Sequence, residues 1–209
     1  MFKRLSGFLL VSLLLPASQL SANEWNFNVY LDDKKVGTHL FEVVDAEEQR
    51  QVQSTANFNV KFLFFSAYRY QHTNTERWAD DCLLRFDAKT NVNGEPIEVS
   101  GQTGDAGFVV KKSDSQELLP GCIMSFAYWN PEFLKQEALL NPQTGEFLDV
   151  DVQLMGAETL EVRGKKIAAQ RYRITAKDID LLVWYSNDDE WLGLESVAKT
   201  GHIIRYELS

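Results

Sequence analysis

The chain's 209 residues, of which 44% are hydrophobic and 24% charged, are enough for one domain with a sizeable core. Its 30 acidic and 21 basic residues leave a formal net charge of −9. That acidity argues against nucleic acid and anionic lipid surfaces as partners, because both repel a negatively charged protein.

The first 22 residues are predicted to form a cleavable export signal. Lys3 and Arg4 provide its positive start, residues 8–15 are apolar, and small residues precede a cleavage point after Ala22. The apolar run is shorter than the roughly 20 residues of a membrane-spanning helix. We therefore expect a periplasmic protein without stable membrane insertion. Its single mature domain, residues 23–209, lacks two of the basic residues and carries a net charge of −11.

The first part of the mature chain alternates apolar and polar residues, a pattern typical of strands. The predicted strands here are 25–31, 36–44, 52–62 and 68–78. The run of residues 62–65 breaks the alternation, so we expect a bend or bulge there.

The middle of the chain is less regular. Residues 82–87 predict a short strand, and a weaker hairpin spans 97–101 and 107–112. The β pattern then lapses between residues 113 and 143. Asn130 followed by Pro131 predicts the start of one short helix, which would end at residues 141–142.

The C-terminal third again predicts strands, separated by turns rich in Gly, Asn and Asp. These strands cover 150–154, 167–175, 179–186, 191–198 and 203–208. With about eleven strands and one short helix, the expected fold is mainly β: a curved antiparallel sheet or an open, β-barrel-like meander. An outer-membrane barrel is the alternative, since a polar lumen could hold the polar faces, but a soluble sheet fits the bulky apolar faces better.

The only two cysteines are Cys82 and Cys122. An even number of cysteines in an oxidising compartment predicts a disulfide between them. The alternative is two separate buried thiols. A redox role is disfavoured because the sequence has no C-x-x-C motif.

Several short motifs resemble a family of uncharacterised exported proteobacterial proteins, a domain-of-unknown-function family. They are residues 128–131 (YWNP), 140–145 (LNPQTG), 171–174 (RYRI), 184–185 (WY) and 201–208. The N-terminal hairpin and the turn around residues 93–94 are also similar, so the resemblance covers most of the mature chain. It implies a periplasmic β-rich domain and carries over no activity and no site residues.

Aromatic side chains are the strongest candidates for a binding site. The speculative ligand-binding residues are Phe62, Phe65, Tyr68, Tyr70 and Trp129. They would line a pocket between the concave sheet and the helix and hold a lipid-like molecule. The same residues are also explained by core packing, or by an exposed contact site for another protein.

Catalytic and metal-binding patterns are not found in the sequence. His39, His72 and His202 have no metal-ligand spacing, and each is best explained structurally. We therefore expect no metal, no cofactor and no catalytic residue. The first functional hypothesis is a periplasmic carrier of an apolar small molecule, and the second is an envelope protein-interaction module. The third, an enzyme of unrecognised type, would require titratable groups that converge in a cleft with strongly perturbed pKa values, for example His72 near Glu76 or an Asp.

Overall fold

The computed structural model describes residues 21–46, 49–62, 65–197 and 201–209. For residues 21, 61–62 and 65–67 it describes the backbone only. The predicted export signal therefore lies almost wholly outside the described residues. The first strand begins at Ser21, two residues before the predicted mature N-terminus.

The described residues form one antiparallel sheet of thirteen strands, in the order β11-β12-β13-β14-β15-β1-β2-β3-β4-β5-β6-β7-β8. The N-terminal arm comprises β1 (Ser21–Leu31), β2 (Lys34–Ala46), β3 (Gln49–Phe62), β4 (Phe65–Ala79), β5 (Cys82–Val92), β6 (Glu95–Gly104), β7 (Gly107–Lys111) and β8 (Gln116–Leu119). The C-terminal arm comprises β11 (Asp151–Val162), β12 (Lys165–Ala176), β13 (Ile179–Ser186), β14 (Trp191–Val197) and β15 (Ile203–Leu208). The arms join where β1 pairs with β15, with Phe27 opposite Leu208.

Tight turns connect neighbouring strands in each arm. Between β5 and β6, Asn93 and Gly94 both have positive φ angles, 55° and 100°. Asparagine and glycine tolerate this conformation, and such turns follow the right-handed twist of a hairpin. The sequence thus encodes most of the meander locally.

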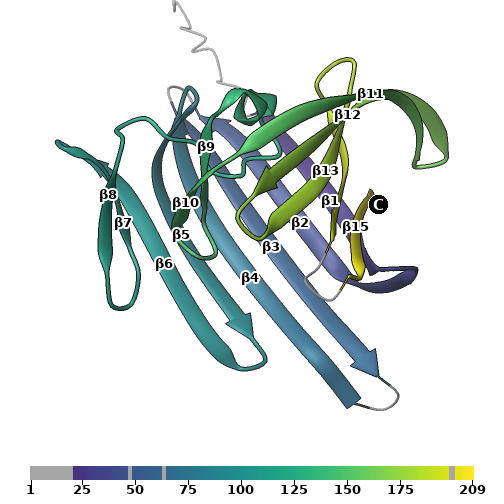
Figure 1. The fold of residues 1–209 in the computed structure, drawn as a ribbon, viewed down its shortest axis with the longest axis horizontal. Helices are drawn as coiled ribbons and strands as arrows, with labels where there is room; N and C mark the ends of the chain where they lie inside the picture. The colour runs from purple at the N-terminus through teal and green to yellow at the C-terminus, as the bar shows by residue number, and fades with distance from the viewer. Residues whose placement is uncertain (1–20, 47–48, 63–64, 198–200) are drawn as a thin grey trace, which may run out of the picture.

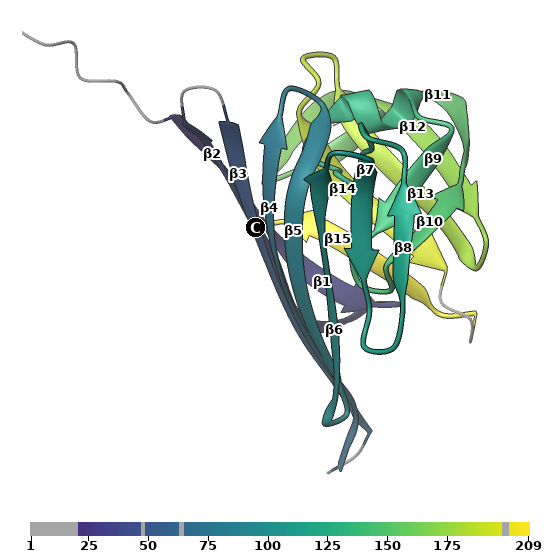
Figure 2. The same cartoon turned by 90° about the vertical axis from the view of Figure 1, so that its left-hand side faces the viewer.

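The sheet is curved and does not close into a barrel. Figure 1 shows the strands side by side, and Figure 2 shows β2–β6 on one side of the molecule with β11–β13 on the other. The inner side holds one apolar cluster that draws on both arms. Its fully buried members include Phe27, Trp78, Phe108, Val183 and Trp191.

The space between the arms is occupied by residues 120–150, hereafter the insert. It contains the 3-10 helix η1 (Pro131–Lys135) and a two-stranded hairpin of β9 (Ala138–Asn141) and β10 (Glu146–Asp149). The disulfide Cys82–Cys122 ties its start to β5, and Leu83 N donates to Ile123 O at 2.9 Å beside it. The predicted disulfide is confirmed.

The predicted mainly β fold with a curved antiparallel sheet is also confirmed, with two local corrections. The expected helix does not reach residues 141–142, because Leu140 belongs to β9 and its N–H donates to Met124 O. The bend or bulge expected at residues 62–65 is the end of a hairpin instead: Phe62 pairs with Phe65, and a bulge-like register shift lies just before it, between Val60 and Lys61. No helix in the described residues is long and apolar enough to span a membrane.

Candidate ligand-binding cavity

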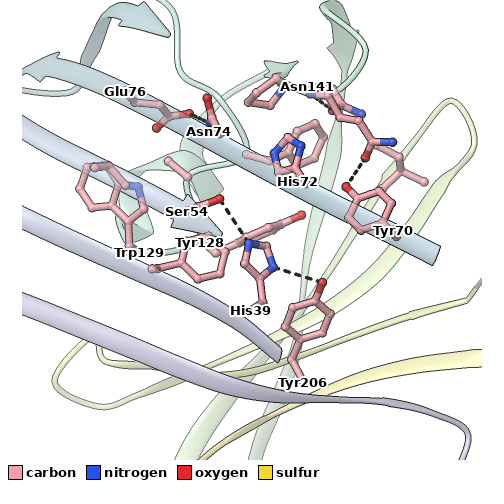
Figure 3. Close-up of a pocket in the computed structure, with 17 residues that line it drawn as sticks. His39, Ser54, Tyr70, His72, Asn74, Glu76, Tyr128, Trp129, Asn141 and Tyr206 are labelled. Atoms are coloured by element: carbon pink, nitrogen blue, oxygen red, sulfur yellow. Dashed lines mark hydrogen bonds between the residues drawn. The ribbon is translucent and has the colours of Figure 1, made fainter. Parts of the chain in front are cut away.

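A partly open cavity of about 220 Å³ lies between the concave face of β2–β4 and the insert. The polar side chains that line it from the sheet are His39, Ser54, Tyr70, His72, Asn74 and Glu76. The insert contributes Tyr128 and Trp129 from one segment and Asn141 and Gln143 from another. Tyr206 of β15 closes one side, as Figure 3 shows.

The strand period explains how β4 supplies four of these side chains. Residues two apart on a strand point to the same face, so Tyr70, His72, Asn74 and Glu76 all lie on the concave side. Tyr68 and Trp78 continue the same row at its two ends. The register with β3 places Ala56 opposite His72 and Phe58 opposite Tyr70. One face of one long strand therefore forms the floor of the cavity.

His39 sits at the centre of a hydrogen-bonded chain. Its Nε2 lies 3.2 Å from Ser54 Oγ and its Nδ1 lies 3.4 Å from Tyr206 Oη (Figure 3). The ring also stacks on Phe41, with 4.1 Å between the ring centroids. Burial, and to a smaller extent the nearby His72, lower the pKa of His39 to about 3. His39 is therefore neutral at physiological pH, with one nitrogen donating and the other accepting.

His72 is buried beside the cavity, and its Nδ1 lies 2.8 Å from Thr90 Oγ1 of β5. Burial lowers its pKa to about 4, so it too is neutral. Within the described residues this hydrogen bond uses Nδ1 alone, which leaves Nε2 for a ligand or water.

Glu76 anchors the insert to the sheet. Its Oε1 accepts from Asn74 Nδ2 at 2.8 Å and from Ser125 Oγ at 3.0 Å, and its Oε2 accepts from Trp78 Nε1 at 2.9 Å. Burial raises the pKa of Glu76, while these three hydrogen bonds oppose that effect. Since Ser125 belongs to the insert, this buried network also holds the insert in place over the β4 side chains that form the floor of the cavity.

Asn74 has an acceptor that the protein leaves unused. Its Nδ2 donates to Glu76, which fixes the orientation of the amide. Its Oδ1 is buried and has no hydrogen-bond partner among the described residues. A buried unpaired acceptor costs about 1–3 kcal/mol. Asn74 lines the cavity, so a bound hydroxyl group that reached Oδ1 would recover that cost.

The mouth of the cavity lies at Tyr70, whose hydroxyl donates to Gln143 Oε1 at 2.9 Å (Figure 3). Beyond Tyr70 the hairpin of β3 and β4 projects past the rest of the molecule, as Figures 1 and 2 show. The concave face around the mouth carries an apolar strip. Alternation and register assign to it Phe58 and Val92 level with Tyr70, Val60 and Tyr68 beyond it, and Ile97 of β6 level with His72. Phe58 stacks on Tyr70 at 5.1 Å, so the strip continues directly from the cavity.

The five residues predicted for ligand binding divide into three groups. Tyr70 and Trp129 line the cavity. Tyr68 is outside it, 38% exposed on the apolar strip and stacked on Tyr70 at 6.4 Å. The side chains of Phe62 and Phe65 lie outside the described residues.

Sequence reasoning found only part of the polar half of the site. It named His72 with Glu76 as groups that could converge in a cleft, and both line the cavity from the same face of β4. It missed His39, which lies on β2, because no spacing in the sequence links that residue to β4. One signal was available: the YWNP and LNPQTG segments, on which the family resemblance depends, both reach the cavity, through residues 128–129 and 141–143.

One pair of side chains in the cavity resembles a catalytic dyad in its contact. Ser54 and His39 have the contact of a nucleophile and its base, but the lowered pKa makes His39 a poor proton acceptor. Among the described residues, no three His, Cys, Asp or Glu side chains are placed to hold a metal ion.

Fold and cavity together define an open, β-barrel-like sheet with a partly open internal cavity of about 220 Å³. The chain belongs to the family DUF6134, a domain of unknown function, whose model matches residues 27–209. Among curated proteins none matches this chain. Among solved structures it is similar to a β-barrel-like protein of the domain of unknown function DUF1849 from Brucella abortus. The TM-score is 0.66 at 13% identity, with 89% of this chain and 94% of that chain covered. At this identity the likeness concerns the fold alone.

Proposed function

We propose that this protein is an exported, periplasmic binding module for a small lipid-like molecule, which occupies the cavity and the apolar strip. The observation that carries the proposal is the continuity of the two surfaces at Tyr70. A polar cavity that opens onto an apolar strip suits a ligand with one polar and one apolar end. The export signal predicted from the sequence supports the location.

The exposed apolar strip is the feature that most favours a bound ligand. Tyr68 is 38% exposed and Ile97 is 41% exposed on the concave face. Exposed apolar side chains that gather on one surface mark contact sites more often than scattered ones do. The cavity of about 220 Å³ is smaller than the roughly 300–1,000 Å³ typical of a complete ligand pocket. The ligand would therefore place its polar end inside and its apolar end along the strip.

The first test is native mass spectrometry with lipid extraction on protein purified from its own periplasm. A stoichiometric co-purifying amphiphile supports the proposal. A clean mass of the protein alone, or of a complex with another protein, would instead favour an interaction module that uses the strip.

A matched pair of variants tests where the apolar end binds. Ile97→Ser removes an apolar side chain from the strip, whereas Leu154→Ser removes one that is 61% exposed on the edge strand β11. We expect Ile97→Ser to weaken binding of the extracted ligand several-fold and Leu154→Ser to leave it unchanged. Equal effects of the two substitutions would refute the placement on the strip.

A further inference from the structure

We propose that the polar end of the ligand is uncharged and rich in hydroxyl groups, as a sugar is, and that the cavity selects it over charged head groups. The inference rests on the proposed function, because it assigns the chemistry of the end that enters the cavity. It follows from the charge and hydrogen-bonding capacity of the lining.

Anionic head groups are disfavoured by the lack of a positive partner. No lysine or arginine is among the described residues that line the cavity, and both of its histidines are neutral at physiological pH. Arg50 lies over the Trp129 ring at 5.0 Å, but it is not a lining residue and it pairs with Asp45. A buried phosphate or carboxylate would therefore lose its hydration without compensation.

Hydrogen-bond acceptors in the cavity wall also disfavour an anionic head group. The buried Oδ1 of Asn74 has no donor among the described residues, and the carboxylate of Glu76 lies beside it. A phosphate or carboxylate offers only acceptors, so it would face these oxygens without a proton to share. A hydroxyl group can donate to Asn74.

The same cavity also offers hydrogen-bond donors. Gln143 presents an amide at the mouth, and Nε2 of a neutral His72 donates or accepts according to its tautomer. A hydroxyl group both donates and accepts, so it satisfies either kind of partner. A mixed set of neutral donors and acceptors therefore matches a polyhydroxyl group better than it matches any ion.

An organic cation is the strongest rival, since aromatic rings and a carboxylate favour one. However, the Glu76 oxygens already accept hydrogen bonds from three protein donors, and burial, which raises the pKa of Glu76, disfavours its charged form. A quaternary ammonium group would also leave Asn74 Oδ1 unpaired, because it has no N–H to donate.

The experiment compares probes that share one chain and differ in the head group. Binding of n-octyl β-D-glucoside, octanoate and octyltrimethylammonium is measured by calorimetry below their micelle concentrations. Methyl β-D-glucoside serves as the head group without the chain. We expect the octyl glucoside to bind at least about tenfold more tightly than either ionic probe, the equivalent of one or two hydrogen bonds to a buried group. The methyl glucoside should bind more weakly than the octyl glucoside.

Two variants locate the selectivity. His72→Phe keeps a ring but removes its nitrogens, and Gln143→Leu removes the amide from the loop between β9 and β10. We expect each to reduce the preference for the glucoside while octanoate binding stays the same. His202→Phe, on the surface, is the control for the first variant and should keep the preference.

The outcomes separate this inference from the proposed function. If the three octyl probes bind equally and Ile97→Ser weakens all of them, the apolar site stands and the head-group inference is wrong. Preference for the ammonium or the carboxylate probe likewise overturns the inference. If methyl glucoside binds as tightly as octyl glucoside, the sugar site stands and the strip has no role. If none of the probes binds, both proposals are refuted.

Discussion

The two cavity histidines should make the protein lose stability as the pH falls from 7 to 5. In the folded state the pKa of His39 is lowered to about 3 and that of His72 to about 4, whereas an unfolded histidine titrates near 6.5. Between these values the unfolded chain binds protons that the folded protein does not, so acidification favours unfolding. The effect is absent well above pH 6.5 and grows as the pH falls toward the folded-state values.

The magnitude follows from the difference in pKa. At pH 5 the medium is about 1.5 units below the unfolded value, and at about 1.36 kcal/mol per unit each histidine costs about 2 kcal/mol. The two together should cost about 4 kcal/mol, a large share of a typical stability of about 5–15 kcal/mol. Glu76 acts in the opposite direction, because its raised pKa favours the protonated folded form as the pH falls.

Urea unfolding at pH 7, 6 and 5 tests this prediction. Each variant is compared with wild type, so that the contributions of Glu76 and of other groups to the pH dependence cancel. His39→Gln and His72→Gln should each reduce the loss between pH 7 and pH 5 by about 2 kcal/mol relative to wild type. If the cavity variants keep the full pH dependence, the two histidines are not held neutral by burial and the argument is refuted.

Three further predictions concern the framework of the site. Replacing both Cys82 and Cys122 by alanine should lower the unfolding free energy by about 4 kcal/mol, the chain-entropy cost of a 40-residue loop, measured as a shift of the urea midpoint. Asn130→Ala removes the side chain that caps η1, whose Oδ1 accepts from the backbone N–H two residues on, and should cost about 1 kcal/mol. An unchanged melting temperature would contradict the capping role. Gly101→Ala would place a methyl group 2.5 Å and 2.6 Å from two fully buried phenylalanine rings, so we expect a loss of about 1–3 kcal/mol by thermal unfolding. Full stability would mean that these rings can move apart.

Local pattern accounts for what the sequence predicted well. The alternation in residues 36–44 and 68–78 places His39 on the concave face of β2, and His72 and its neighbours on that of β4, as the structure confirms. The turn at residues 93–94 is likewise a local signal. The pattern failed where contacts with other segments outweigh the local helix signal. The residues near Leu140 pair with β10 and with Met124 instead of continuing the helix.

The sequence by itself therefore determined a mainly β meander, its hairpin turns, the pairing of its only two cysteines and the capping of one short helical turn. These features depend on the strand period, on turn chemistry and on a unique choice of partners. Only the tertiary structure decided that β1 pairs with β15 and that the insert covers β2–β4. The cavity needs both, because Tyr206 comes from β15 and Tyr128 from the insert. Contacts between such distant residues depend on packing and burial, which no local pattern encodes.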